Sequence, residues 1–239
     1  MYPYRLCFCK TGALKYISHL DLQRTFSRAL RRTDIPVAYS RGFNPQPRLR
    51  FALPLALGIE GKNEYLDINL SAPLQEKIIK ETLNAQLPAG LRVKAVSAVE
   101  SKQPALSSLV EAALYVVCLE ACPADLPREL DSLLQAREIC VERCGKKGTR
   151  KIDIRPFIHK LEISKQEKGG ALLMLLAAGS RGSARPQEVL ALLPVKGLKD
   201  KIYRADLFIF RDGELQTPAG VSVERYLEVF YGKENYNQL

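Results

Sequence analysis

The sequence predicts an α+β protein of two tandem ferredoxin-like (βαββαβ) domains with antiparallel sheets, followed by a short C-terminal extension. Three observations predict this fold. The chain has 239 residues, more than one average domain, and 46% of them are hydrophobic, enough for two cores. Hydrophobic patterning in the first half follows the order βαββαβ. The second half repeats that order without repeating the residues. The predicted domains are residues 1–100 and 110–211, with the extension at 212–239.

In the first half, alternation of apolar and polar residues predicts strands, and apolar residues at helical spacing predict helices. The expected strands are residues 4–9, 49–53, 64–70 and 91–99, and the expected helices are 18–32 and 73–87. Leu22 and Phe26 lie one turn apart on the first helix. Ser18, with Asp21 three residues later, is typical of a helix N-cap. Pro73 suits the first turn of the second helix.

In the second half, the expected strands are residues 112–120, 139–143, 158–164, 171–177 and 201–211, and the expected helices are 124–136 and 186–193. Strands 158–164 and 171–177 form a hairpin around a glycine-containing turn at 168–170. Residues 100–109 have the composition of a linker. We expect residues 212–239 to form a tail, with a turn at Asp212 and Gly213 and a short helix at 223–230, that becomes ordered on a partner.

Membrane and metal-binding classes are not favoured by the sequence. The longest apolar run, residues 171–178, has eight residues, whereas a membrane span needs about 20. The N-terminus lacks the apolar core of a signal peptide, so we expect a cytoplasmic protein without a membrane partner. Six cysteines then indicate reduced thiols, and no pair has the CxxC spacing of a zinc site. No metal and no cofactor is predicted.

Positive charge is concentrated at the N-terminal end of the chain. Residues 1–58 contain ten Lys or Arg and two Asp or Glu, a local balance of +8, while the whole chain has a net charge of +10. A clustered positive charge favours a polyanionic partner, with nucleic acid first and an anionic membrane surface second. The alternative is a generally basic protein whose charge serves solubility.

The first predicted helix places arginines on one stripe. Arg24, Arg28, Arg31 and Arg32 are spaced at i, i+4, i+7 and i+8, opposite the apolar stripe. Only Asp21 lies close enough within the helix to pair with one of them. Unpaired guanidinium groups suit phosphate binding because each can donate two parallel hydrogen bonds. The alternative is a solvated helix face.

The loop at residues 41–48 follows this helix and is stiffened by two prolines. Proline restricts both its own backbone and that of the preceding residue, and Gly42 permits a positive φ. Phe43, between Arg41 and Arg48, could stack on an unpaired base while the arginines bind phosphates. Alternatively, Phe43 fills the core beneath a rigid turn.

A second basic run covers residues 143–160, where seven Lys or Arg face one Asp, a local balance of +6. We take Lys146, Lys147, Arg150 and Lys151 as candidate nucleic-acid-binding residues that follow a phosphate backbone. Two alternatives remain open, a docking loop for an acidic protein and a solvated basic loop.

His19 is one of two histidines and lies at the predicted start of the first helix. It could act as a general acid–base in RNA cleavage, or it could make a structural hydrogen bond. The sequence has no GxGxxG, Walker or HExxH motif. The basic segment therefore looks more like a surface that holds a ligand than like a site that transforms one.

The motif-rich segment resembles a known family. The runs concerned are Tyr-Ile-Ser-His-Leu-Asp-Leu at 16–22, Ala-Leu-Arg-Arg at 29–32, Ile-Pro-Val-Ala-Tyr-Ser-Arg-Gly-Phe-Asn-Pro-Gln-Pro-Arg at 35–48, and Glu-Tyr-Leu-Asp-Ile at 64–68. They look like the "radical SAM-linked" family of uncharacterised proteins, encoded beside or fused to a cobalamin-binding-type radical SAM protein. The resemblance implies a radical SAM partner and does not imply a chemistry.

Together these observations predict a non-catalytic RNA-binding adaptor that works with a radical SAM enzyme in tRNA or rRNA modification. For such a protein we predict no catalytic residue. One alternative is a metal-independent endoribonuclease that uses His19. Another is a protein-docking module for the radical SAM partner without RNA contact.

Overall fold

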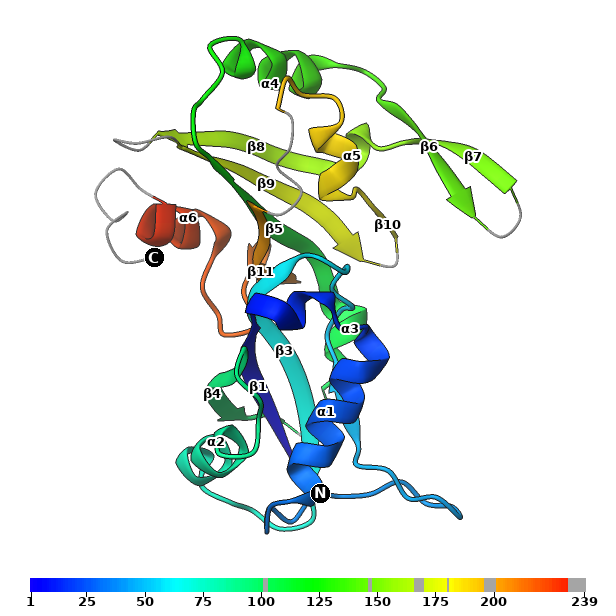
Figure 1. Cartoon of the computed structure of the whole chain (residues 1–239), viewed down its shortest axis with the longest axis vertical. Helices are drawn as coiled ribbons and strands as arrows, with labels where there is room; N and C mark the ends of the chain where they lie inside the picture. The colour runs from blue at the N-terminus through cyan, green and yellow to red at the C-terminus, as the bar shows by residue number, and fades with distance from the viewer. Residues whose placement is uncertain (101–102, 146–147, 166–169, 180, 196–200, 232–239) are drawn as a thin grey trace. The chain divides into compact units, whose positions relative to one another are not determined.

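The structure of the protein, a computed structural model, describes residues 1–100, 103–145, 148–165, 170–179, 181–195 and 201–231 (Figure 1). The chain divides into two compact units, Met1–Val110 and Glu111–Leu239. Among the helices that the described residues form, none is both long and apolar enough to cross a membrane.

The first unit is built around a central strand. Its elements are β1 (Tyr2–Lys10), the 3-10 turn η1 (Gly12–Tyr16), α1 (His19–Arg31), β2 (Leu49–Phe51), β3 (Glu60–Leu70), α2 (Glu76–Asn84), β4 (Leu91–Ala98) and α3 (Leu106–Leu109). β1 pairs antiparallel with β3 on one side and β4 on the other, and β2 pairs with β3. The elements of this unit that the patterning predicts all form, although β3 begins four residues earlier than expected.

The core of the first unit lies on one face of its strands. Alternate residues of β1, including Leu6 and Phe8, point to that face and pack against the apolar stripe of α1 and against α2. The rings of Phe8 and Phe26 meet edge to face with their centroids 4.9 Å apart, and Phe51 of β2 completes the aromatic cluster. Because the apolar stripe of α1 is buried, its polar stripe with the arginines is directed to solvent.

The second unit contains more strands than predicted. Its elements are β5 (Val110–Leu119), α4 (Leu126–Gln135), β6 (Cys140–Gly145), β7 (Gly148–Asp153), the 3-10 turn η2 (Arg155–Phe157), β8 (Ile158–Lys165), β9 (Gly170–Gly179), β10 (Gly182–Ser183), α5 (Pro186–Leu190), β11 (Ile202–Arg211), β12 (Glu214–Gln216) and α6 (Val223–Tyr231). β9 pairs antiparallel with β5, β8 and the short β10. β12 pairs with β11, and β6 and β7 form a separate two-stranded sheet.

Helices cover both faces of the sheet in the second unit. α4 and α5 lie on one side of β8 and β9, and α6 lies on the other (Figure 1). Leu173 and Leu175 of β9 pack with Tyr226 and Leu227 of α6, while the intervening Met174 is buried on the opposite face. β9 is therefore buried on both faces, as its unbroken apolar sequence indicates.

The prediction of two tandem ferredoxin-like domains is wrong. The described part of the chain is mostly sheet, with 41% strand and 27% helix, and it contains a large mixed sheet of 10 strands together with 6 helices. The ferredoxin-like pattern places its helices on one face of the sheet, and the patterning of the second half predicts five strands there. The additional strands β7, β10 and β12 and the helix α6 on the second face do not fit that pattern.

The predicted C-terminal extension is also corrected. Residues 212–231 belong to the second unit, because β12 adds to β11 and α6 contributes Val223 and Tyr226 to the apolar core. The segment carries enough apolar surface to be a core helix without a partner. The polar end, residues 232–239, lies outside the described residues.

Candidate nucleic-acid interface

The start of α1 is fixed by its N-cap. The Ser18 hydroxyl accepts a hydrogen bond from the backbone N–H of Asp21 at 3.1 Å, which confirms the predicted cap. The same hydroxyl donates to the Asp21 carboxylate at 2.6 Å. The hydrogen bond from Ser18, followed by the interaction with Arg24, holds the pKa of Asp21 below its ordinary value. Asp21 is therefore an anion at neutral pH, and Arg24 is its neighbour.

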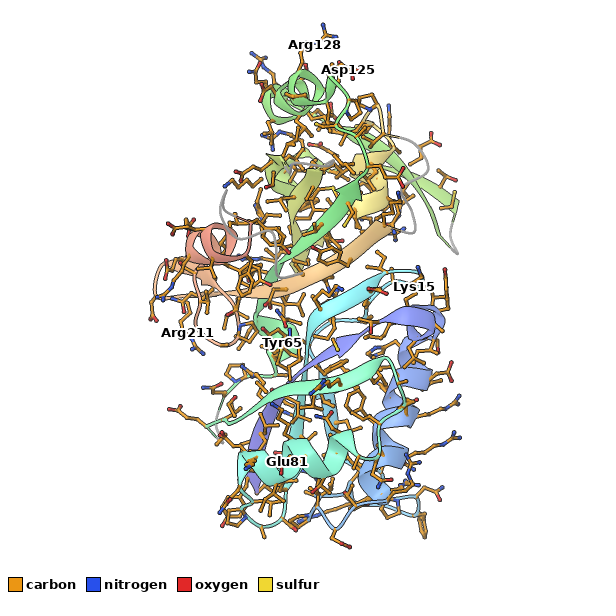
Figure 2. All side chains as sticks on the ribbon, turned by 60° about the vertical axis from the view of Figure 1, so that its left-hand side comes forward. Lys15, Tyr65, Glu81, Asp125, Arg128 and Arg211 are labelled. Carbon is orange, nitrogen blue, oxygen red and sulfur yellow. The ribbon has the colours of Figure 1, made fainter. Side chains whose placement is uncertain are left out.

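A groove of about 460 Å³ runs beside α1. The helix lines it with Leu20, Gln23, Arg24, Ser27, Arg28 and Arg31, and the opposite wall consists of Gln46, Pro47 and Leu49. We call it the arginine groove. Figure 2 shows nitrogen-bearing side chains extending from the outward face of α1. Three of the four predicted helix arginines therefore meet the predicted loop across a single hollow.

The opposite wall belongs to a tight hairpin formed by residues 38–48. The backbone N–H of Ser40 donates to the carbonyl of Gln46 at 2.9 Å, and the N–H of Gln46 donates to the Ser40 hydroxyl at 3.0 Å. The N–H of Arg48 donates to the carbonyl of Ala38, also at 3.0 Å. Gly42 at the tip has a φ of 131°, a value that disfavours any side chain. The loop is therefore a braced turn whose tip extends from the body.

Arg31 connects the two walls of the groove. Its guanidinium donates to the side-chain oxygen of Gln46 at 2.8 Å and to the carbonyl of Pro45 at 3.4 Å. These bonds use part of its donor capacity, since a guanidinium has five N–H groups. Arg31 both positions the loop and contributes positive charge to the groove.

Among the arginines of the groove, Arg28 and Arg24 have the weakest contacts within the protein. Arg28 is exposed, and it has no hydrogen bond or ion pair within the described part of the chain. Arg24 makes a 3.3 Å ion pair with Asp21, in which both side chains are more than half exposed. Exposed pairs of this kind contribute little to stability. Both guanidinium groups can therefore turn to an incoming anion at small cost.

Arg32 does not lie in the arginine groove. Its guanidinium donates to the side-chain oxygen of Gln86 at 3.1 Å and to the Gln86 carbonyl at 2.7 Å, beyond the end of α2. Residues spaced by eight positions on a helix differ in direction by about 80°, so Arg32 diverges from Arg24. The structure thus separates Arg32 from the other three helix arginines and gives it an internal partner.

The predicted loop residues lie at and beside the hairpin tip. Phe43 is fully exposed, so the alternative in which it fills the core is wrong. Arg41 is also exposed and has no hydrogen bond or ion pair among the described residues. Arg48 is half-buried at the base, where its guanidinium lies 3.6 Å from the sulfur of Met1. A fully exposed phenylalanine beside an arginine is the arrangement that base stacking requires.

His19 lies at the first turn of α1, on the side of Phe51. Its Nε2 is 3.1 Å from the side-chain nitrogen of Gln23, and its ring meets that of Phe51 edge to face at 5.3 Å. An imidazole packed on a core aromatic ring fits the structural interpretation better than acid–base catalysis. Within the described residues, no group of three or more His, Cys, Asp or Glu side chains is arranged to hold a metal ion.

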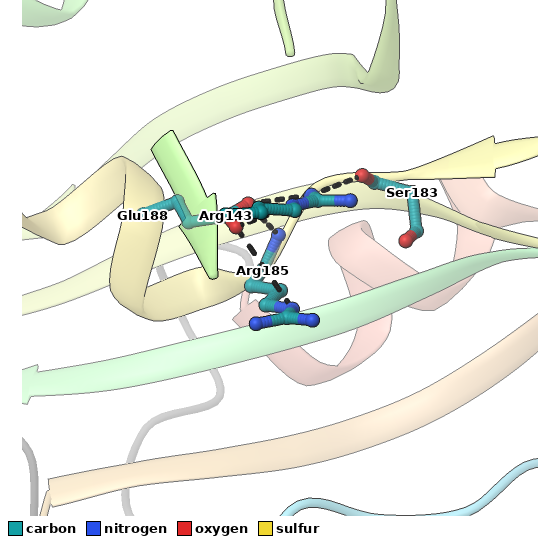
Figure 3. Close-up of polar contacts among 4 residues, drawn as sticks. All are labelled: Arg143, Ser183, Arg185 and Glu188. Atoms are coloured by element: carbon teal, nitrogen blue, oxygen red, sulfur yellow. Dashed lines mark hydrogen bonds and ion pairs between the residues drawn. The ribbon is translucent and has the colours of Figure 1, made fainter. Parts of the chain in front are cut away.

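Two arginines of the second basic run, Arg143 and Arg155, hold parts of the second unit together. The Arg143 guanidinium contacts both carboxylate oxygens of Glu188 and the carbonyl of Ser183 (Figure 3). Arg155 donates to the carbonyls of Leu134 and Ile158. Arg150 and Lys151 are exposed on β7, whereas Lys146 and Lys147 lie outside the described residues.

Sequence reasoning did not identify the remaining lining of the arginine groove. Leu20, Gln23 and Ser27 share the helix face of Arg24, so their spacing could have indicated them. Gln46 could not have been identified in this way, because its place depends on a hydrogen bond to a residue fifteen positions earlier.

Comparison with known proteins places the chain in a family. The family model described as "Uncharacterized protein conserved in bacteria (DUF2344)" matches residues 3–186. The chain belongs to this family. The match includes every described residue of the arginine groove and of the hairpin beside it.

Two further comparisons add little to the DUF2344 assignment. No curated protein matches the chain. Among solved structures, the chain is similar to an unknown protein from Galdieria sulphuraria, with 15% identity, a TM-score of 0.26, and coverage of 80% of this chain and 88% of that one.

Proposed function

We propose that the protein is a non-catalytic RNA-binding protein that holds single-stranded RNA along the arginine groove. Arg24 and Arg28 bind phosphates, Arg31 supports them, and Phe43 at the hairpin tip stacks on an unpaired base. One observation carries the proposal. Arg28 lies in a groove without a protein partner in the described chain, beside a hairpin that exposes a complete aromatic ring.

Single-stranded RNA fits this surface better than a duplex does. An exposed phenylalanine can stack only on a base that is not already stacked between neighbouring bases. Proteins that bind single strands without sequence preference combine a positively charged groove with aromatic side chains of this kind. The hairpin is held to α1 through Arg31 and Gln46, so Phe43 is presented with little loss of conformational entropy on binding.

We propose further that this RNA-binding protein works with a partner enzyme. The resemblance of residues 15–70 to the radical SAM-linked family supports a role as an adaptor that presents tRNA or rRNA to a radical SAM enzyme. Co-purification of the two proteins after nuclease digestion would favour a direct docking module. Association that depends on intact RNA would favour the adaptor.

Fluorescence anisotropy with a labelled single-stranded RNA, measured over a range of salt concentrations, tests the groove. Two phosphate contacts, one from Arg24 and one from Arg28, predict a slope of about −1.4 in a plot of log K against log salt. Arg28→Gln removes one contact and makes the slope less steep by about 0.7. Arg92→Gln is the matched control, because Arg92 is exposed on β4, between Leu91 and Val93, whose side chains face α1 and α2.

Phe43→Ala separates base stacking from phosphate binding. It should weaken binding by about 1–3 kcal/mol while leaving the salt slope unchanged. Salt-independent binding, or identical behaviour of Arg28→Gln and Arg92→Gln, would overturn the proposal. RNA recovered at full length after the assay is expected. Cleavage that disappears in His19→Ala would instead support the ribonuclease alternative.

A further inference from the structure

A second hollow lies within the second unit. It has a volume of about 360 Å³ and predominantly apolar walls. We call it the aromatic pocket and define it by Phe157 of η2, His159 of β8, Gly182 of β10, Phe210 of β11, and the Glu111 and Arg181 side chains. Apolar hollows of this size with a few convergent polar groups are the usual form of small-molecule sites.

His159 is directed to the pocket by an irregularity in its strand. The pairing of β8 with β9 shifts between Ile158 and Lys160, so that two residues of β8 occupy the place of one at His159. Bulges of this kind re-aim a side chain and are common next to functional sites. Burial lowers the pKa of His159 below its ordinary value, and the Glu111 carboxylate opposes this only in part. At neutral pH the imidazole is uncharged and offers one donor and one acceptor.

Gly182 provides the space for one aromatic wall. A Cβ atom built on Gly182 would lie 2.2 Å from the Phe157 ring, and the residue has a φ of 142°. Only glycine allows this ring to lie against the β10 backbone. A second aromatic residue of the pocket, Phe210 of β11, pairs with Leu215 of β12 and is 61% exposed. A bound planar ligand would therefore remove a large apolar surface from water.

The charges at the pocket compensate each other. Arg181 and Glu111 form a 2.7 Å ion pair, in which the arginine is mostly exposed and the carboxylate is partly buried. With a neutral His159, the described residues of the pocket have no net charge. The pocket thus suits an uncharged ligand, and it can offer donors from Arg181 and acceptors from Glu111 to the edge of a ring.

We propose that the aromatic pocket binds a nucleobase, with the ring between Phe157 and Phe210 and its polar edge against His159, Glu111 and Arg181. A planar, uncharged nitrogen heterocycle with donors and acceptors on its edge satisfies the size, the aromatic walls and the charge balance together. The base comes either from a free nucleoside or from a nucleotide splayed out of an RNA strand. The site is independent of the arginine groove.

The test uses the full chain with adenosine, guanosine, cytidine and uridine as separate probes in ligand-observed NMR titrations. We expect saturable binding of at least one nucleoside. Gly182→Ala should abolish it, because the new methyl group displaces Phe157. Gly220→Ala is the matched control, since Gly220 also has a positive φ, 86°, but has no atoms within 4 Å of a Cβ. It should bind as the wild type does.

Phe210→Ala is a second variant, and it changes an exposed side chain that is not part of the core. The exposed ring contributes little to folding, and its loss should weaken nucleoside binding about fivefold or more. Phe43→Ala removes an even more exposed ring in the first unit and should leave nucleoside binding unchanged. It should weaken RNA binding only if the arginine groove acts as proposed, so the two proposals fail separately.

A short RNA oligonucleotide identifies the source of the base. If the oligonucleotide binds more tightly than its nucleosides, and Gly182→Ala removes this difference in affinity, the bound base is one splayed out of RNA. Equal binding indicates a free nucleoside. The proposal is overturned if neither probe binds at millimolar concentration, or if Gly182→Ala and Phe210→Ala bind both probes as the wild type does.

Discussion

The guanidinium of Arg143 donates hydrogen bonds to both carboxylate oxygens of Glu188: its Nε lies 2.6 Å from Oε1, and its Nη2 lies 2.7 Å from Oε2. Both side chains are more than four-fifths buried. The Glu188 carboxylate also accepts the backbone N–H of Arg185 at the start of α5. One carboxylate therefore closes the first turn of α5 and attaches the β6–β7 hairpin to it (Figure 3).

Replacing Glu188 should loosen this attachment. Glu188→Gln leaves the partly buried Arg143 without its anion, and we expect a loss of about 2–3 kcal/mol in the free energy of unfolding, measured by urea denaturation. Glu129→Gln is the control, since its pair with Arg128 lies at the surface of α4 (Figure 2). That change should cost about 0.5 kcal/mol or less. Equal losses in the two variants would contradict the structural role of the pair.

The bond between Gln46 and Arg31 should determine how rigid the hairpin is. Gln46→Ala removes the side-chain oxygen that accepts from Arg31. Amide hydrogen exchange at residues 41–44 should then accelerate about fivefold, which corresponds to about 1 kcal/mol. Gln86→Ala removes the corresponding acceptor of Arg32 and should leave exchange in the hairpin unchanged. Unaltered exchange in Gln46→Ala would show that the backbone bonds to Ser40 suffice.

Two serines of α1 should respond to alanine with opposite signs. Ser18→Ala removes the N-cap and should lower the free energy of unfolding by about 1 kcal/mol. Ser27→Ala, within the same helix, should raise it by about 0.5 kcal/mol because alanine has the higher helix propensity. Thermal or urea unfolding of both variants measures the difference. Destabilisation of similar size at both positions would argue against the cap.

Burial of His159 should make stability depend on pH. Its pKa is lower in the folded protein than in the unfolded chain, so the unfolded chain binds the proton more readily. The free energy of unfolding should fall as the pH drops below about 6.5, the ordinary histidine pKa, towards the folded value. His159→Gln should flatten this decline, and His19→Gln should retain it. A flat profile in the wild type would contradict the lowered pKa of His159 in the folded protein.

Several elements could be predicted from the sequence because local and tertiary preferences agree in them. α1 has a serine cap, an apolar stripe through Leu22 and Phe26, and a polar stripe, so its place and its exposed face follow from residue spacing. The strands of the first unit alternate cleanly because one face of each packs on the helices. The hairpin of β8 and β9 is also confirmed.

The remaining fold depends on contacts between distant segments. β7 has the sequence Gly-Thr-Arg-Lys-Ile-Asp, with one apolar side chain and four exposed residues, so it has no apolar alternation to reveal it. β10 and β12 have two and three residues, too few for any period to be visible. The sequence did contain one neglected signal: the unbroken apolar run of β9 is typical of a strand covered on both faces, which the expected fold does not provide.

The candidate groove was predictable on its helical wall and not on the other. Arg24 and Arg28 lie as their spacing indicates, whereas Arg32 turns to Gln86 because a helix with 3.6 residues per turn does not hold position i+8 in line. Lys146 and Lys147 lie outside the described residues, and the role of Arg150 and Lys151 stays a prediction.

The pairing of β5 with the distant β9 has a consequence for synthesis of the chain on the ribosome. β5 is complete at Leu119, but its partner β9 ends only at Gly179, and α6 closes the core later still. Until β9 emerges, β5 is an apolar strand with both hydrogen-bonding edges open, because its other neighbour in the sheet, β11, is synthesised later still. Open apolar strands of this kind can pair with the wrong neighbour in a nascent chain. Premature termination between these strands would therefore yield a polypeptide that is prone to aggregation.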